Sequence, residues 1–292
     1  MERNILFVVP REKKSFFYPL KGPWEIVSEE EILSRLKERR KQGKDRVFLS
    51  VIGPEEFRKR VQRLLSGFQS PEVVFSEGDS FSALLSTLSE GLPPDEIEPR
   101  SMELIRELID LSSFSPKAHP LILRLVHASG DPELVKTLIL SREGVETGVS
   151  LLREGAWVVC DVEMVAAGID RRRLVALGGK VLCAVREAGT PPSGYTRTAW
   201  GMERVLHKHP EVGIVVVGNA PTALLSALRV LTEKPRRVLV VGFPVGFVRA
   251  AEAKLLLAQS PFPHLTNYGS RGGSGLAAAA LNALLRLAHE TA

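Results

Sequence analysis

The chain has 292 residues, of which 44% are hydrophobic and 25% are charged. This composition is ordinary for a globular protein, and the length allows one large domain or two smaller ones. No apolar run approaches the roughly 20 residues that span a membrane. The N-terminal MERNILFVVPREKK has no small-residue cleavage site after its apolar run, so it predicts a first strand and not a signal peptide.

The net charge of +5 is unevenly distributed along the chain. Residues 1–97 contain 16 Lys+Arg and 16 Asp+Glu, so the whole excess lies in residues 98–292. A modest basic excess favours an anionic ligand. It is too weak to indicate nucleic acid, and no stripe of Lys/Arg with interleaved aromatics occurs. We therefore expect neither a nucleic-acid nor a membrane partner.

The two cysteines, Cys160 and Cys183, each end an apolar run. Such positions favour buried, reduced thiols over a disulfide or a metal site. His207 and His209 lie together at a polar helix end and lack an evident third ligand, so no metal site is predicted. Reduced cysteines predict a cytoplasmic protein.

Residues 1–95 show three short strands, each followed by a helical pattern, and predict a small α/β domain. Ser28 with Glu31 forms a capping box, and Pro54 stands near the start of a second helix. The domain has no His, no Cys and no glycine-rich phosphate loop, which favours an accessory role. The predicted strands are Asn4–Val9, Arg46–Ile52 and Glu72–Phe75, and the predicted helices are Ser28–Gly43, Pro54–Phe68 and Ser80–Gly91.

Adjacent prolines with acidic neighbours in Leu92–Ile97 predict a linker before a second domain, residues 96–292. That domain alternates strands and helices, so we expect a doubly wound, mostly parallel α/β sheet of about five strands. The apolar runs Ile214–Val217 and Val238–Val241 suit strands covered on both faces. The other predicted strands are Trp157–Cys160, Val181–Val185 and His264–Thr266. The predicted helices are Arg100–Leu111, His119–Ser129, Asp131–Leu140 with Asp131 as N-cap, Gly144–Glu154, Ala199–Lys208 and an Ala-rich C-terminal helix.

The unusual residues all follow the ends of predicted strands. Ligands of open parallel sheets bind at the carboxyl ends of the strands, so these residues predict one cavity floored by glycines. They are Asp161 and Glu163, Arg197, Asn219 and Thr222, Pro244 to Phe247, and Arg271 to Ser274.

The glycine-rich segment Gly269–Ser274 precedes a helix, a pattern that favours an anion cradle made of backbone N–H groups. The alternative is a flexible loop that only turns the chain. Neither a P-loop nor Gly-x-Gly-x-x-Gly occurs at a strand–helix junction, which disfavours a nucleotide and a Rossmann dehydrogenase. No Gly-x-Ser-x-Gly elbow supports a hydrolase.

His127 ends a helix in Leu-Val-His-Ala-Ser-Gly-Asp. A helix C-terminus favours the protonated imidazole, which would suit a proton donor, although a structural histidine is the commoner case. The positions of Asp161 and Glu163 are compatible with an acid/base pair or with acceptors for loop N–H groups. Arg197 reads either as a clamp for a carboxylate or as a surface arginine.

Seven motifs in order over residues 98–290 resemble the precorrin-8X methylmutase family, also called cobalt-precorrin-8 methylmutases. The motifs are Arg100-Ser101, Val126-His127-Ala128-Ser129-Gly130, Asp161-Val162-Glu163-Met164-Val165-Ala166, Thr196-Arg197-Thr198-Ala199, Gly218-Asn219-Ala220-Pro221-Thr222-Ala223-Leu224, Pro244-Val245-Gly246-Phe247-Val248 with Ala251-Glu252, and Arg271-Gly272-Gly273-Ser274. Residues 1–97 lie outside the resemblance.

The resemblance implies an isomerase of cobalamin biosynthesis. Such an enzyme moves a methyl group from carbon 11 to carbon 12 of precorrin-8X or cobalt-precorrin-8 by a 1,5-sigmatropic shift. The products are hydrogenobyrinate or cobyrinate. No cofactor is consumed, and cobalt enters only as part of the substrate. The resemblance also implies a homodimer, and neighbouring corrin-pathway enzymes as further partners.

By the same resemblance His127 is the catalytic acid, and the remaining motif residues hold the tetrapyrrole. The implied substrate-binding residues are Arg100, Ser101, Ser129, Asp161, Glu163, Met164, Thr196, Arg197, Thr198, Asn219, Thr222, Pro244, Val245, Gly246, Phe247, Arg271, Gly272, Gly273 and Ser274.

The chain departs from the family pattern at four positions. Thr198 and Ala253 stand where the family often has Ser, Arg249 stands where it often has Gly, and Ser270 interrupts the usual spacing before the last motif. Arg249 adds a charge beside the Pro-Val-Gly-Phe segment, which bears on substrate preference more than on the reaction. A non-catalytic tetrapyrrole-binding or carrier protein is the alternative to the enzyme. The role of residues 1–95 stays open between dimerisation, docking of a pathway enzyme and a remnant of another enzyme.

Overall fold

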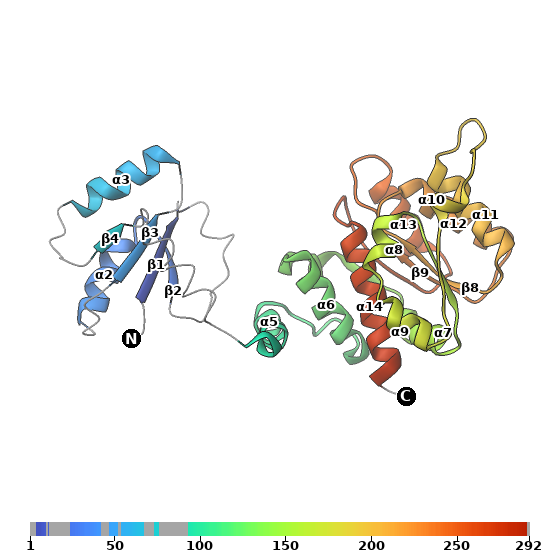
Figure 1. Cartoon of the computed structure of the whole chain (residues 1–292), viewed down its shortest axis with the longest axis horizontal. Helices are drawn as coiled ribbons and strands as arrows, with labels where there is room; N and C mark the ends of the chain where they lie inside the picture. Colours follow the sequence, from blue (N-terminus) through green and yellow to red (C-terminus); the bar gives the residue numbers. More distant parts are fainter. Residues whose placement is uncertain are drawn as a thin grey trace. The chain divides into compact units, whose positions relative to one another are not determined.

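The computed structural model describes residues 4–9, 11, 24–41, 47–51, 54–66, 73–75 and 93–290 (Figure 1). Its contacts divide the chain into two compact units, residues 1–94 and 95–292. We call them the N unit and the C unit. No helix of the described residues is both long enough and apolar enough to cross a membrane.

The N unit contains a parallel sheet with the strand order β2-β1-β3-β4. The strands are β1 (Asn4–Val9), β2 (Trp24–Ser28), β3 (Val47–Val51) and β4 (Val73–Phe75). Three of them confirm the sequence prediction. The fourth, β2, was not predicted, and it ends at the residue expected to cap a helix.

Two amphipathic helices accompany this sheet, α2 (Ile32–Lys41) and α3 (Glu55–Leu65). The prediction that a helix begins at Ser28 was wrong, because Ser28 completes β2. The capping contact still forms, since the Glu31 carboxylate accepts the Ser28 N–H at 2.9 Å. Pro54 directly precedes α3, as predicted. The predicted helix over 80–91 lies outside the described residues.

The C unit is built on a six-stranded sheet with the order β5-β10-β9-β8-β6-β7. All neighbours are parallel except β5, which pairs antiparallel with β10. The strands are β5 (Leu138–Leu140), β6 (Trp157–Cys160), β7 (Val181–Cys183), β8 (Val212–Val217), β9 (Leu239–Gly242) and β10 (His264–Asn267). This confirms a doubly wound, mostly parallel sheet.

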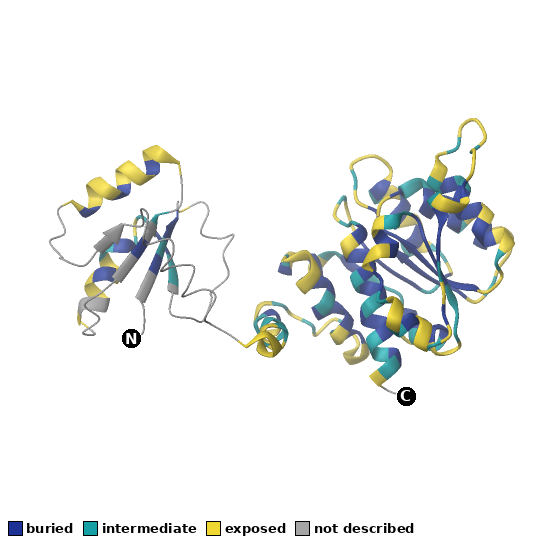
Figure 2. Cartoon of the chain, viewed as in Figure 1, coloured by how far each residue is buried: buried dark blue, intermediate teal, exposed yellow. Residues whose placement is uncertain are grey.

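Helices cover both faces of that sheet, so its central strands are buried (Figure 2). Alternate residues along each strand enter different cores: Val158 and Cys160 pack with α6, α7, α8 and α14, whereas Val159 packs with α11, α12 and α13. The helices are α5 (Pro94–Leu108), α6 (His119–Ser129), α7 (Gly144–Arg153), α8 (Glu163–Gly168), α9 (Arg171–Ala176), α10 (Ala184–Glu187), α11 (Arg197–Lys208), α12 (Pro221–Glu233), α13 (Ala250–Gln259) and α14 (Ser274–Glu290), with short 3-10 turns η1 (Pro116–Ala118) and η2 (Pro132–Thr137).

Two predictions for the C unit were wrong. Residues 94–97 are helical and begin α5, because acidic residues and a leading proline suit a first helical turn as well as a linker. The predicted helix Asp131–Leu140 is a 3-10 turn followed by β5. Asp131 caps it as expected, accepting the Glu133 N–H at 3.0 Å, but Leu138–Leu140 joins the edge of the sheet.

Candidate active site

The five parallel strands of the C unit end at one edge of the sheet, at the top of this unit in Figure 1. Every predicted strand-end residue therefore lies in the loops or first helical turns along that edge. In chain order the sheet has the arrangement 2-1-3-4-5, in which the crevice for a ligand opens where the strand order reverses. Here that point lies between β6 and β8.

Asp161 lies at this point, directly after β6. Its buried carboxylate accepts the N–H groups of Gly218, Asn219 and Ala220, at 3.2, 2.8 and 2.7 Å. Burial raises the pKa of this carboxyl, and the backbone N–H donors oppose the rise. The three donors lie just before α12, where an external anion would otherwise be held. Asp161 thus fastens two loops together, which favours the structural alternative over an acid/base pair.

The hydroxyl-bearing residues predicted at two neighbouring loops do meet. The Thr196 hydroxyl lies 2.8 Å from that of Thr222 and 3.3 Å from that of Thr198. Thr196 also caps α11 by accepting the Ala199 N–H. Arg197 is the first residue of α11 and not part of the preceding loop; it is exposed, with one guanidinium contact to the Val185 carbonyl at 3.4 Å.

Glu163 and Met164 open α8, directly after the buried Asp161. The Glu163 carboxylate pairs with Arg186 and does not contact Asp161 in the described structure. Beside it, burial is the main cause that raises the pKa of Cys183 to about 11, and a hydrogen bond with Glu163 adds to the rise. Both cysteines are buried and free, as predicted. The Met164 side chain is 73% exposed.

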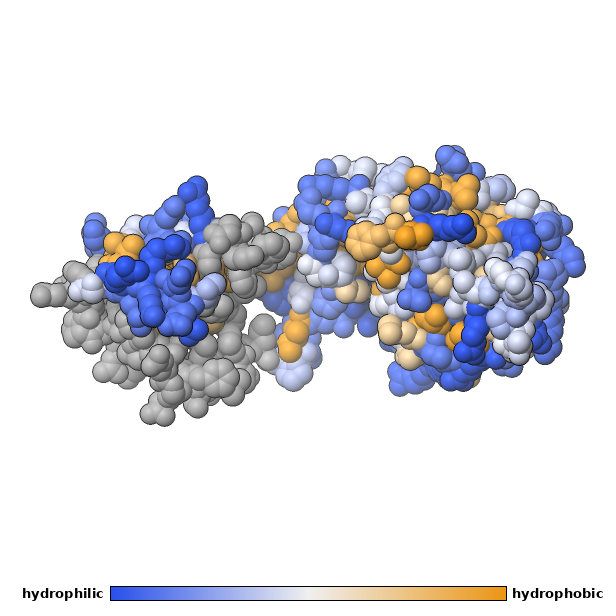
Figure 3. All heavy atoms as spheres, turned by 90° about the horizontal axis from the view of Figure 1, so that it is seen from above, coloured by the Kyte–Doolittle hydropathy of each residue, from blue (hydrophilic) through white to orange (hydrophobic). Residues whose placement is uncertain are grey.

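The segment after β9 is unusually apolar for an exposed loop. Phe247 is 96% exposed and Val248 79%, and Val245 is exposed as well, while Pro244 is buried beneath them. Figure 3, which looks down on this edge from above, shows hydrophobic surface gathered on the C unit. Exposed apolar side chains in this density mark a binding surface.

The glycine-rich loop after β10 packs against that segment. The Gly273 N–H donates to the Phe243 carbonyl at 2.8 Å, and the Gly246 N–H donates to the Ser270 carbonyl at 3.1 Å. A side chain at Gly272 would overlap the Phe243 carbonyl oxygen. Because the Gly273 N–H is already bonded, the loop is not the fully open anion cradle that its glycines suggested. Ser274, which is buried, begins α14.

The sequence comparisons cover this same unit. The family model for precorrin-8X methylmutase matches residues 96–287. A cobalt-precorrin-8 methylmutase of Priestia megaterium is 36% identical over 200 residues, covering 67% of this chain and 88% of the relative. A precorrin-8X methylmutase of a Sinorhizobium species is 40% identical over 197 residues, covering 65% and 93%. This chain belongs to the precorrin-8X methylmutase family.

The solved structures agree with that assignment. A precorrin-8X methylmutase from Thermus thermophilus superposes with a TM-score of 0.61 at 35% identity, covering 67% of this chain and 98% of its own. A precorrin-8X methylmutase related protein gives 0.60 at 32% identity, covering 64% and 100%. The predicted family is confirmed, and with it an isomerase family of cobalamin biosynthesis.

The C unit, which the family model covers and which we call the methylmutase unit from here on, places His127 on the last turn of α6, in an exposed position. Gly130 ends the helix in the left-handed region, with φ of 62°, and its N–H donates to the Val126 carbonyl. Ser129 is engaged locally, donating to Val126 and accepting from the Asp131 N–H. The described residues provide no hydrogen-bond or ion-pair partner for the imidazole, which leaves the ring accessible.

An ion pair joins this helix end to the glycine-rich loop of the methylmutase unit. The Arg271 guanidinium lies 2.7 Å from Asp131 Oδ2, and α6 and α14 pack side by side (Figure 1). His127 therefore stands at the strand-end edge, although it comes from a helix that precedes every parallel strand of the methylmutase unit. This pairing also means that Arg271 already has a carboxylate partner within the chain.

Arg100 and Ser101 are not brought to this edge by any contact of the described structure. Arg100 pairs with Glu103 at 2.8 Å, and the Ser101 hydroxyl donates to the Ile97 carbonyl one turn back. Both contacts lie within α5. The helix itself is tied by Glu98 to Arg124 of α6 and Arg286 of α14.

The sequence interpretation missed Lys254 and Asn267, two polar residues buried beside the glycine-rich loop of the methylmutase unit. Lys254 lies on the face of α13 that also buries Ala250, Ala253 and Leu257. A lysine at helical spacing within an apolar face is a detectable signal. The predicted site was based on residues at strand ends, and Lys254 lies within a helix.

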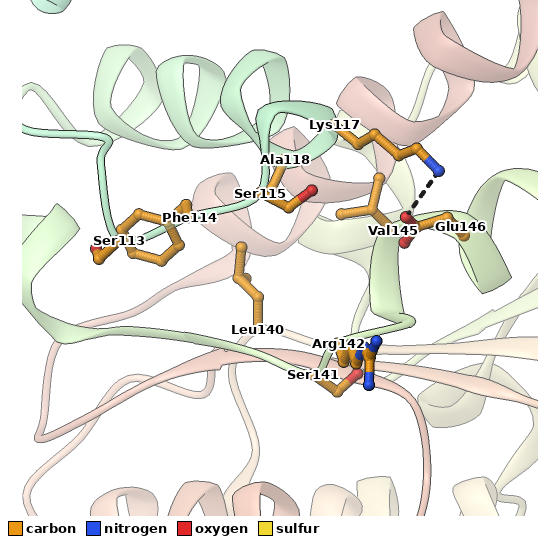
Figure 4. Close-up of a pocket in the computed structure, with 10 residues that line it drawn as sticks. All are labelled: Ser113, Phe114, Ser115, Lys117, Ala118, Leu140, Ser141, Arg142, Val145 and Glu146. Atoms are coloured by element: carbon orange, nitrogen blue, oxygen red, sulfur yellow. Dashed lines mark ion pairs between the residues drawn. The ribbon is translucent and has the colours of Figure 1, made fainter.

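A cavity of about 250 Å³ lies elsewhere in the methylmutase unit (Figure 4). Phe114, Leu140 and Val145 form its apolar wall, and Lys117 pairs with Glu146 at its rim at 3.4 Å. Leu140 pairs with Leu265 near the start of β10, whereas the predicted site follows the end of that strand. This cavity is therefore distinct from the strand-end edge.

Proposed function

We propose that this chain catalyses the methylmutase reaction on precorrin-8X or cobalt-precorrin-8, the substrates named for its relatives. A methyl group leaves carbon 11 and bonds to carbon 12 of the same ring. The reaction is an isomerisation, so no atom is gained or lost and no cofactor is consumed. Cobalt, where present, belongs to the substrate.

In this proposal His127 donates a proton to the macrocycle and takes it back after the methyl group has migrated. An imidazole suits this exchange because a ring nitrogen can donate a proton and accept it again. The single observation that carries the assignment is the exposed ring of His127 at the edge where the apolar Phe247 segment and the glycine-rich loop meet.

The surroundings suit a wide, flat polyanion. Exposed Met164, Val245 and Phe247 offer apolar area for the face of a tetrapyrrole, and Arg197 offers an exposed guanidinium for a carboxylate. The proposed contacts also include Thr198, Asn219 and Thr222. The whole net charge of +5 lies in residues 98–292, which supports the binding of a substrate rich in carboxylates.

A homodimer and a cytoplasmic location belong to the same proposal. Exposed Leu255 and Leu256 on α13, beside the apolar loop after β9, provide surface that a second copy would cover. Two buried free cysteines suit a reducing compartment.

The test is the visible spectrum of the purified protein incubated with precorrin-8X or cobalt-precorrin-8. Conversion to the corrin chromophore supports the enzyme, and a stable, unchanged complex supports the carrier alternative instead. His127→Ala should still bind the tetrapyrrole but lose about 10²- to 10⁴-fold in kcat, the usual contribution of a general acid. His207→Ala is the matched control, since His207 also ends a helix but lies on α11. Unchanged turnover by His127→Ala would refute the acid role.

A further inference from the structure

Lys254 is a fully buried lysine with no carboxylate partner among the described residues. Its ammonium donates to the Asn267 side-chain oxygen at 3.2 Å and to the Arg271 carbonyl at 2.5 Å. Burying an ammonium against neutral oxygens is costly, and buried lysines are rare unless they are paired. The cost indicates that this contact has a purpose beyond filling the core.

The contact lies beneath the glycine-rich loop. The Asn267 amide donates at 3.1 Å to the same Arg271 carbonyl and to the Tyr268 carbonyl. The loop is joined on its other side to the segment after β9, through the Gly246 N–H and the Gly273 N–H. The main chain at Arg271 is thus held from below by Lys254 and laterally by the neighbouring loop.

The side chain of Arg271 connects this restrained main chain to Asp131. Its guanidinium pairs with Asp131 Oδ2, while Asp131 Oδ1 accepts the Glu133 N–H. Asp131 follows His127 by four residues and lies just beyond the Gly130 cap of α6. One continuous set of contacts therefore runs from the buried ammonium, through Arg271 and Asp131, to the helix end that bears His127.

We propose that Lys254 is a positioning residue: through the Arg271 main chain and the Arg271–Asp131 ion pair, it sets the placement of His127 against the tetrapyrrole. This inference rests on the proposed function. Lys254 does not touch the substrate, because its side chain is closed off from solvent. Its effect falls on kcat more than on KM, since small displacements of a reacting group cost up to about 100-fold in rate.

The first experiment compares Lys254→Met with Lys254→Gln. Methionine keeps the length and apolar stem but has no donor, whereas the glutamine amide can still donate. We expect kcat to fall about 10- to 100-fold in Lys254→Met, with KM changed less than about threefold, and to recover partly in Lys254→Gln. Lys208→Met, at the exposed end of α11, is the control and should match the wild type. Thermal melts show whether each variant is folded.

The second experiment asks whether Lys254 acts through Arg271. In an Arg271→Ala background, Lys254→Met should lower kcat by less than about twofold. The Arg271–Asp131 ion pair, through which Lys254 would act on His127, is already absent there. A merely structural lysine would give losses that multiply. Trypsin cleavage after Arg271 gives a readout without substrate, and it should quicken in Lys254→Met but not in Lys208→Met.

Two failures are distinguishable. Wild-type protein without turnover overturns the proposed function, and this inference with it. Wild-type turnover that Lys254→Met leaves intact, or losses that multiply with Arg271→Ala, overturns the inference alone.

Discussion

At the strand-end edge, two connections between separate segments are held by buried charges of opposite sign. Between β6 and β8 the anion Asp161 binds three backbone N–H groups. Between α13 and the loop after β10 the cation Lys254 binds a backbone carbonyl and an amide oxygen. The sign of each charge matches the backbone groups that face it: N–H donors face Asp161, and a carbonyl acceptor faces Lys254. The start of α12 exposes donors, whereas the glycine-rich loop exposes acceptors.

The two buried groups also differ in what acts on their pKa values. Burial raises the pKa of Asp161 but the three N–H donors oppose it, whereas burial lowers the pKa of Lys254 to about 8 and no opposing cause accompanies it. The β6–β8 fastening is thus a saturated anion site. At Lys254 burial acts without an opposing interaction, which suits a contact kept for positioning.

Among the substitutions that test this comparison, we expect the largest loss of stability at Asp161. Asp161→Ala leaves three N–H groups near the start of α12 without their acceptor, and we expect a loss of about 3 kcal/mol in the free energy of unfolding. Asp161→Asn removes the buried charge but keeps one oxygen, so its loss should be about 1 kcal/mol. Urea unfolding measures both. An alanine variant as stable as the wild type would contradict the fastening role.

Gly272→Ala should have an intermediate effect, because a Cβ there overlaps the Phe243 carbonyl oxygen and separates the two loops. We expect a loss of about 2 kcal/mol in unfolding free energy, as for other overpacked sites, and weaker tetrapyrrole binding. Gly275→Ala is the control, since nothing lies near its added methyl and it stands within α14. That variant should be neutral or up to about 1 kcal/mol more stable.

The last effect concerns how stability depends on pH. The pKa of Lys254 is about 8 in the folded chain against an ordinary value of 10.5, so between these values the unfolded chain binds more protons. The contribution of Lys254 to stability therefore rises with pH across that window. Urea unfolding of the wild type and of Lys254→Met at pH 7.5, 9 and 10.5 should show the wild type gaining relative to the variant. Parallel pH profiles would contradict the assignment of the shift to Lys254.

The sequence by itself determined the family, the parallel strands and the edge where the site residues gather. Apolar runs such as Ile214–Val217 and the glycine and proline residues after them are local signals, and local signals survive without tertiary context. Helix α6, from His119 to Ser129, was predicted with its bounds because its proline start and glycine end are both local.

Only the tertiary structure decided which charges meet. Leu138–Leu140 forms an edge strand because it pairs with β10, which lies far along the chain. Asp161 holds two loops together because residues 57 to 59 positions away supply its N–H donors. Lys254 is buried for the same reason, since Asn267 and Arg271 reach it through the packing of α13 on β10. Each outcome depends on contacts between distant segments, which residue spacing alone does not encode.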